Sequence, residues 1–168
     1  MKRVISILLC TFILVASILS ASAEFIPHPG DTITLRCNHG VGDYIILDGH
    51  PRDGTVGLVP VPTVSGINWK VVDLGDGSVG IYCLGNIDGN RWLNGNTGAH
   101  SVNLAPNTTG KKYIGTHWKM VALSDGCIGF YCLGTDTAYR WLEGNSRFKL
   151  VGLASDTTND PGTHWHVH

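Results

Sequence analysis

Gly115-Thr116-His117-Trp118 is the stretch that decides the fold, because the chain repeats it. It returns as Gly162-Thr163-His164-Trp165, and an earlier variant reads Gly66-Ile67-Asn68-Trp69. A cysteine recurs with almost the same period, at Cys37, Cys83 and Cys132. One pattern of short strands present three times in a small chain predicts a threefold all-β fold. The copies should share one core, because no copy can bury its apolar face alone.

The first 23 residues have the composition of a secretory signal peptide. A basic start, Met1-Lys2-Arg3, precedes an apolar run over 4–19, and the small residues 20–23 end in an Ala-x-Ala site. The alternative is a membrane anchor, although the run is shorter than the roughly 20 residues of a spanning helix. We expect cleavage after Ala23, which leaves one domain at 24–168. That domain should be secreted, and either extracellular or periplasmic.

The charge of the chain limits its partners. Without Lys2 and Arg3, ten basic side chains face thirteen acidic ones, and no cluster of Lys and Arg occurs. Such a chain lacks the electrostatic footprint of a protein that binds nucleic acid or anionic lipid. We therefore expect no nucleic-acid partner, and no membrane span in the mature chain.

Each copy contains four predicted strands, which are short runs rich in Val, Ile, Tyr and Trp that alternate with polar residues. They are 32–37, 44–47, 55–59 and 67–72 in copy one (about 32–72), 78–84, 91–93, 101–104 and 117–122 in copy two (73–121), and 127–133, 140–142, 149–153 and 164–167 in copy three (122–168). Gly75-Asp76-Gly77 and Ser124-Asp125-Gly126 predict tight turns between copies. Asp48-Gly49, Asn94-Gly95 and Glu143-Gly144 predict turns that end the second strands. We expect no helix after Ala23.

Twelve strands in three four-strand units fit a β-trefoil, a closed barrel capped by hairpins that leaves no strand edge exposed. The alternation along each strand predicts which side chains face the interior. The expected core is Leu35, Leu47, Leu58, Trp69, Val71, Ile81, Leu93, Leu104, Trp118, Met120, Phe130, Leu142, Leu153, Trp165 and Val167.

The three repeated cysteines alternate with apolar residues along their strands, so their sulfurs should point into the core. A buried apolar thiol is the favoured interpretation. One disulfide between two of the three is the alternative, since disulfides form in the oxidising compartments that secreted proteins enter. Cys127 has the opposite parity, and we expect it nearer the surface.

The order of these motifs resembles the repeats of ricin-type lectins and fascin-like domains. Copies two and three run from a strand ending in Cys-Leu-Gly, through Arg-Trp-Leu-x-Gly and Val-x-Leu-Ala, to Gly-Thr-His-Trp. Asn90-Arg91-Trp92-Leu93 is similar to the fascin pattern Gly-Lys/Arg-Tyr-Leu, whereas Thr-His-Trp stands where the lectins have Gln-x-Trp. The resemblance covers 32–168 and implies a β-trefoil. The replaced Gln argues against a ricin-type sugar site, and the secretory signal argues against actin bundling.

Catalysis finds little support, since no Gly-x-Ser-x-Gly, His-Glu-x-x-His or phosphate-loop signature occurs. Paired carboxylates for glycoside hydrolysis stay open as an alternative, because such pairs can meet only in space. We expect no enzyme and no cofactor. Trp92 and Trp141 neighbour core leucines and should face outward, where an indole stacks on a sugar ring. Amide and carboxylate groups suited to sugar hydroxyls follow them. The predicted ligand-binding residues are Trp92, Asn94, Asn96, Trp141, Glu143 and Asn145. Alternatively, both Trp side chains close the end of the barrel. Copy one has Ile46 at this position, and we expect it to lack the site.

His164, His166 and His168 alternate along the last predicted strand and should share one outward face. Two such imidazoles can hold Zn²⁺ or Cu²⁺. Solvated terminal histidines are nevertheless the favoured interpretation, and no metal site is predicted. Asn107-Thr108-Thr109 is an N-glycosylation sequon in a predicted loop.

These features favour a secreted, non-catalytic, lectin-like protein whose partners are glycans or glycoconjugates, with repeated sites that raise avidity. The alternative is a β-trefoil protein inhibitor or toxin-like protein that presents loops 60–65 and 105–114 to a protein partner. A structural matrix protein is the third class.

Overall fold

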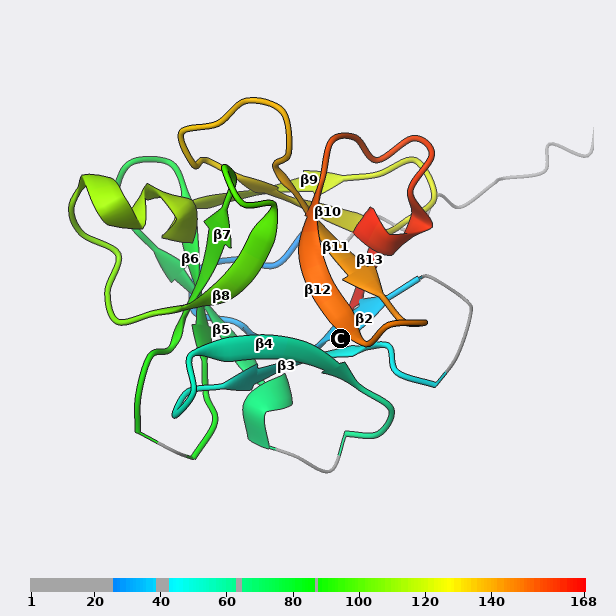
Figure 1. Cartoon of the computed structure of the whole chain (residues 1–168), viewed down its shortest axis with the longest axis horizontal. Coiled ribbons are helices and arrows are strands. Elements are labelled where there is room, and N and C mark those ends of the chain that lie inside the picture. Colours follow the sequence, from blue (N-terminus) through cyan, green and yellow to red (C-terminus); the bar gives the residue numbers. More distant parts are fainter. Residues whose placement is uncertain (1–25, 39–42, 63–64, 87) are drawn as a thin grey trace, which may run out of the picture.

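The computed structural model describes residues 26–38, 43–62, 65–86 and 88–168, so the predicted signal peptide lies outside the described residues. Strands dominate the regular structure of the described chain, and its helices are short 3₁₀ turns (Figure 1). Copy one contains β1 (Thr32–Ile33), β2 (Leu35–Cys37), β3 (Ile46–His50), β4 (Thr55–Val59) and β5 (Trp69–Asp73). Copy two contains β6 (Val79–Cys83), β7 (Trp92–Asn96), β8 (Ser101–Ala105) and β9 (Trp118–Ala122). Copy three contains β10 (Ile128–Cys132), β11 (Trp141–Asn145), β12 (Leu150–Ala154) and β13 (Trp165–Val167).

The first and fourth strands of the three copies form a closed barrel. Antiparallel pairs β5–β6 and β9–β10 join one copy to the next, and β6–β9 and β10–β13 pair within copies two and three. The first strand closes the ring, because β1 pairs with β5 while β2 pairs with β13. Every barrel strand therefore has a neighbour on both sides, and no open edge remains.

The second and third strands of each copy form a hairpin that caps the barrel. The hairpins are β3–β4, β7–β8 and β11–β12, and they lie around a common centre in Figure 1. A six-stranded barrel capped by three hairpins in threefold arrangement is a β-trefoil, as the sequence predicts. The turns between copies also form as predicted, because Gly77 and Gly126 adopt the positive φ angles of 82° and 80° that their tight turns require.

The three repeated tryptophans form the centre of the core. Trp69, Trp118 and Trp165 are fully buried. Each indole N–H donates a hydrogen bond to the carbonyl of the core leucine in its own copy, at 3.2, 2.9 and 2.9 Å. The buried ring therefore has no unsatisfied polar atom. The predicted core is confirmed except at Met120 and Val167, which are only half-buried because they lie at the barrel margin.

Gly49, Gly95 and Gly144 lie inside strands β3, β7 and β11, so the predicted turns there are wrong. The chain turns later, at 51–54, 97–100 and 146–149. These glycines are explained by close packing. A Cβ on Gly95 would lie 2.7 Å from the sulfur of Cys132 and 3.2 Å from the ring of Trp118. Gly49 and Gly144 meet Cys83 and Cys37 in the same way. The cysteine sulfur of each copy therefore packs against a glycine of the preceding copy, and copy three takes that place for copy one.

The Gly and Thr of the repeated Gly-Thr-His-Trp motif have separate structural roles. A Cβ on Gly115 would lie 2.1 Å from the carbonyl oxygen of Gly95, so only glycine fits there. The hydroxyls of Thr116 and Thr163 donate to carbonyls three residues earlier, at 2.7 and 2.6 Å. These bonds close the short 3₁₀ helices η2 (Lys111–Thr116) and η3 (Pro161–Thr163), and copy one has the corresponding helix η1 (Ser65–Ile67) with Ile67 in place of the threonine. We did not predict these helices.

All four cysteines of the described residues are buried thiols, which confirms the buried-thiol interpretation for Cys37, Cys83 and Cys132. Burial raises the pKa of the Cys83 and Cys132 thiols, so both stay neutral. The expectation for Cys127 is wrong, because its exposed fraction is only 1%. Its side chain faces away from the core, as its parity requires, but a ring nitrogen of His166 lies 3.7 Å from the sulfur.

Replacing Gly95 with Ala should lower the free energy of unfolding by about 1–3 kcal/mol, because the new methyl group overlaps the sulfur of Cys132. Urea denaturation measures this change. The double variant Gly95→Ala/Cys132→Ala should lose less than the sum of the two single changes, since the sulfur is then gone. Gly98→Ala is the matched control, because the nearest atom to its new Cβ is 3.9 Å away. Additive effects in the double variant would contradict the proposed contact.

Candidate functional site

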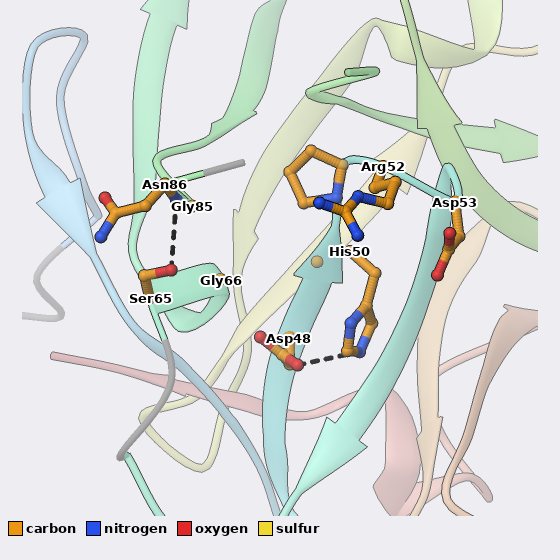
Figure 2. A pocket seen from close by; sticks show the side chains of 10 residues that line it. Asp48, His50, Arg52, Asp53, Ser65, Gly66, Gly85 and Asn86 are labelled. Atoms are coloured by element: carbon orange, nitrogen blue, oxygen red, sulfur yellow. Dashed lines mark hydrogen bonds and ion pairs between the residues drawn. The ribbon is translucent and has the colours of Figure 1, made fainter. Parts of the chain in front are cut away.

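A pocket of about 350 Å³ opens beside the β3–β4 hairpin (Figure 2). We call it the copy-one pocket. Its walls come from the hairpin, from η1 and from the chain after β6. Glycine backbone at Gly49, Gly66 and Gly85 forms much of the lining. The side chains that line it are mostly polar: Asp48, His50, Arg52, Asp53, Ser65 and Asn86. Such a pocket offers hydrogen-bond donors and acceptors around a surface that a ligand can approach closely.

Asp48 is the buried charge of this pocket, with an exposed fraction of 2%. Its carboxylate lies 3.0 Å from Nε2 of His50, whose own side chain is exposed. Burial raises the pKa of Asp48, and the charge of His50 partly offsets that rise. A carboxylate held in place at the edge of a pocket is a fixed acceptor for ligand hydroxyl groups.

Copy two builds the same pocket from equivalent positions, and we call it the copy-two pocket. Its volume is about 310 Å³, and its walls are the β7–β8 hairpin, η2 and the chain after β10. Asn94 replaces Asp48, and its amide donates to the side chain of Asn103 at 2.7 Å. Asn96, Lys111 and Lys112 also line this pocket. The same concavity therefore recurs in two copies with different side chains.

Copy three has the corresponding elements, with Glu143 and Asn145 on β11 beside η3. Glu143 is half-buried, and a Cβ added to Gly162 would lie 3.1 Å from its Cγ. By sequence, the residues that correspond to the third wall include 39 and 40, which lie outside the described residues.

The predicted site residues are divided between two surfaces. Asn94 and Asn96 line the copy-two pocket, but Trp92 lines a separate hollow of about 510 Å³ with Tyr82, Lys70 and Asp73. Trp92 is half-buried, because its ring covers Gly80 and packs edge-on against Tyr82 with centroids 4.8 Å apart. Trp141 repeats this packing over Gly129 and Tyr131.

Sequence reasoning missed the copy-one pocket, because it took the outward Trp as the mark of a site. Copy one has Ile46 at that position, and Ile46 is buried. In both described pockets the lining comes from the hairpin end and the 3₁₀ helix, and the Trp position is not part of it. The signal that marks the pockets is the pair of close-packed glycines, Gly49 with Gly66 and Gly95 with Gly115.

Two histidines of the repeated motif clamp the loops beside the barrel. His117 places Nδ1 2.9 Å from Asp76 and Nε2 3.0 Å from the carbonyl of Thr108. His164 makes the equivalent contacts, at 2.5 Å with Asp125 and 2.8 Å with the carbonyl of Thr157. Each imidazole thus ties a long loop to the turn between two copies. In copy one, Asn68 takes the place of the histidine.

The charges around the copy-three clamp favour an ion pair. Partial burial lowers the pKa of His164, but the hydrogen bonds to Thr157 and Asp125 and the nearby negative charges raise it overall. Burial raises the pKa of Asp125, but its bonds to His164 and to the backbone of Cys127 hold it below its usual value overall. Both shifts favour a positive imidazole opposite a negative carboxylate.

No model of a known protein family and no curated protein sequence matches the chain. Solved structures do resemble it. One is a GlcNAcα1-4Gal-releasing endo-β-galactosidase from Clostridium perfringens, with a TM-score of 0.62 and 13% identity over 82% of this chain. The chain spans 32% of that enzyme. Another is SeviL bound to asialo-GM1 saccharide, with a TM-score of 0.60 and 11% identity, covering 84% of this chain and 98% of SeviL. At these identities the likeness establishes the fold. In the described part of the chain, no helix is long and apolar enough to cross a membrane.

Replacing Asp76 with Asn should remove an acid-sensitive contribution to stability. Hydrogen bonds from the Ser78 hydroxyl and backbone N–H, with a smaller effect of His117, lower the pKa of Asp76 to about 2. A carboxylate whose pKa is lower in the folded chain stabilises the fold above about 3.8, and this contribution is lost as the pH falls toward about 2. At pH 7 the free energy of unfolding of the wild type should exceed that of the variant by about 1 kcal/mol or less, because the Asp76 carboxylate is half exposed.

Urea denaturation of both proteins from pH 7 to pH 2 measures this difference, which should close toward the acid end. Asp88→Asn, at an exposed carboxylate, is the control and should show little difference at any pH. A gap that stays constant down to pH 2 would contradict the role assigned to Asp76.

Proposed function

We propose that this protein is a secreted, non-catalytic lectin-like protein that binds glycans through its hairpin pockets. The observation that carries the proposal is the recurrence of one glycine-lined pocket, edged by polar side chains, beside the hairpins of copies one and two. Sugars present closely spaced hydroxyl groups, and these match clustered carboxylate, amide, imidazole and guanidinium groups better than an apolar cavity would.

The size and spacing of the pockets support binding to multivalent ligands. Volumes of about 350 and 310 Å³ lie at the lower end of small-molecule sites, which suits a terminal mono- or disaccharide. Each site alone should bind weakly, because little area is buried. Two or three sites fixed on one rigid barrel raise the apparent affinity for a glycan-coated surface.

The structural neighbours agree with this class of ligand. SeviL is bound to a saccharide, and the C. perfringens enzyme acts on a galactoside. Secretion is proposed from the sequence of 1–23, and it would place the protein where cell-surface glycans are found.

A glycan array followed by calorimetry tests the proposal. The wild type should bind at least one class of glycan. Arg52→Ala/Asn86→Ala alters the copy-one pocket, and Asn94→Ala/Lys111→Ala alters the copy-two pocket. Each double variant should weaken binding to a glycan-coated surface by about 10–100-fold through lost avidity. Arg36→Ala is the matched control, because Arg36 is exposed on β2, away from both pockets.

A folded wild type that binds no glycan would overturn the proposed function and favour a protein partner. Binding that survives both pocket variants but is lost in Trp92→Ala would overturn the pockets as the site. It would move the site to the hollow of Trp92 and Tyr82.

A further inference from the structure

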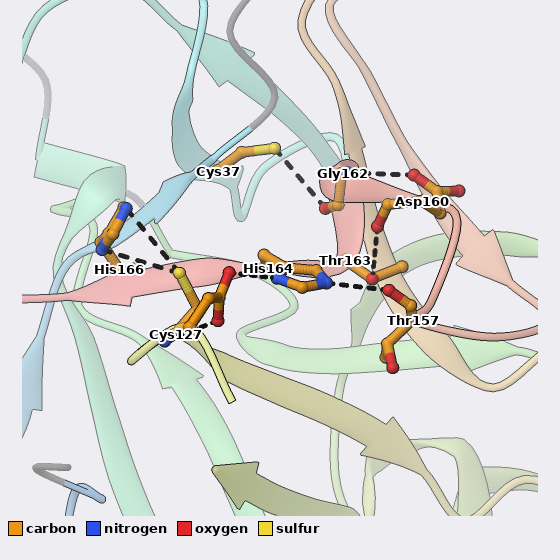
Figure 3. Close-up of polar contacts among 9 residues, drawn as sticks. Cys37, Cys127, Thr157, Asp160, Gly162, Thr163, His164 and His166 are labelled. Atoms are coloured by element: carbon orange, nitrogen blue, oxygen red, sulfur yellow. Dashed lines mark hydrogen bonds and ion pairs between the residues drawn. The ribbon is translucent and has the colours of Figure 1, made fainter. Parts of the chain in front are cut away.

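Four side chains with metal-ligating atoms meet where β10 begins and β13 passes it. In the described part of the chain, one carboxylate oxygen of Asp125, the sulfur of Cys127 and one ring nitrogen of His164 all lie within 4.8 Å of one another. His166 adds a second imidazole, whose ring nitrogens lie 3.7 and 3.8 Å from the same sulfur. Figure 3 shows Cys127 between His164 and His166.

The repeat supplies an internal comparison for this cluster. β6 and β9 of copy two pair in the same register as β10 and β13, with Val79 opposite Trp118 and Ile128 opposite Trp165. The positions equivalent to Asp125, Cys127, His164 and His166 are Asp76, Ser78, His117 and Lys119. The Asp–His clamp therefore recurs without any metal requirement. Copy three differs from copy two at the other two positions. The Cys127 thiol replaces the Ser78 hydroxyl, and the His166 imidazole replaces the Lys119 ammonium group.

Both exchanges introduce ligands that zinc prefers. Copy one has Gly30, Thr32, Asn68 and Lys70 at the same four places, and none of these is a usual ligand of zinc. Only copy three, among the three equivalent sites, combines thiol, two imidazoles and a carboxylate. If His166 were only a solvated histidine, the Cys127 thiol beside it would have no explanation.

One of the distances already suits a tetrahedral ion, and the other ligands must move to reach it. Zinc–sulfur bonds of about 2.3 Å and zinc–nitrogen bonds of about 2.0–2.1 Å place sulfur and nitrogen about 3.6 Å apart at a tetrahedral angle. The separation between the Cys127 sulfur and the His166 ring is close to this value. Nδ1 of His164 and the carboxylate of Asp125 are hydrogen-bonded at 2.5 Å and must separate to about 3.3 Å to share an ion.

The second nitrogen of His164 already has the partner that a metal ligand needs. Nε2 donates to the carbonyl of Thr157 at 2.8 Å, which fixes the ring with Nδ1 turned toward Asp125. Metal-bound histidines commonly make such a bond through their other nitrogen, and it orients the ring. The site also has an entry path, since the Asp125 side chain is 38% exposed and His166 is exposed.

We propose that Asp125, Cys127, His164 and His166 form a binding site for Zn²⁺. On binding, the thiol proton of Cys127 and the proton shared by His164 and Asp125 pass to water, and a thiolate, two neutral imidazoles and a carboxylate bind the ion. The closed ligand set indicates a structural site. It would lock the C-terminal strand β13 to the turn before β10.

Cobalt titration of the metal-stripped full chain tests the site. We expect one Co²⁺ per chain, with tetrahedral ligand-field bands and a sulfur-to-cobalt charge-transfer band, and displacement by Zn²⁺. Cys127→Ser/His166→Lys restores the residues of copy two at these positions, so it should fold normally. It should lose the charge-transfer band and weaken Zn²⁺ binding by more than about 100-fold. Zn²⁺ should raise the Tm of the wild type and leave that of this variant unchanged.

The reciprocal change gives a second, independent readout. Ser78→Cys/Lys119→His installs the copy-three ligands around Asp76 and His117, and the stoichiometry should rise from one Co²⁺ per chain to two. Binding without a charge-transfer band would overturn the proposal, because the ion would then sit on surface histidines such as His168. Failure of the wild type to bind, or equal binding by Cys127→Ser/His166→Lys, would also overturn it.

Discussion

The contact of a sulfur and an indole with a bare glycine is the constraint on which this fold depends. Gly49, Gly95 and Gly144 have no room for a Cβ, because a cysteine from the next copy and the motif tryptophan fill that space. The indole then bonds to the carbonyl two residues before the glycine. This one arrangement sets the distance between hairpin and barrel in every copy. It also explains why glycine, cysteine and tryptophan recur together at fixed spacing.

The sequence predicts the barrel well because barrel strands obey simple alternation. Trp118, Phe130 and Leu142 face the interior as their parity requires, and the period of the repeat fixes the number of units. It predicts the hairpins less well, because glycine has two uses that look alike in a sequence. Gly126 allows a positive φ in a turn, whereas Gly95 allows close packing inside a strand. Only the three-dimensional position of Cys132 separates these two roles.

The same difficulty limits prediction of the site. Asn94 was identified because it follows Trp92, yet the structure directs the two toward different hollows. Which elements of other copies complete a pocket is decided by barrel closure, and no local pattern carries that information. The Cys127–His166 pair was missed for a similar reason. Its partners are 39 residues apart, and strand register alone brings them together.

The sulfur contacts also link the three copies in a ring rather than a row. Cys83 packs against copy one, and Cys132 packs against copy two. Cys37 instead packs against Gly144 and Gly162 of copy three, 107 and 125 residues away. Strand β2 of copy one therefore completes its packing only against β11 and η3 of copy three. During synthesis, the N-terminal units must wait for β13 before the ring can close. Such non-local closure delays folding of the whole domain until β13 has been made. A chain with this topology would therefore remain unclosed, and open to unfolding, for as long as β13 is missing.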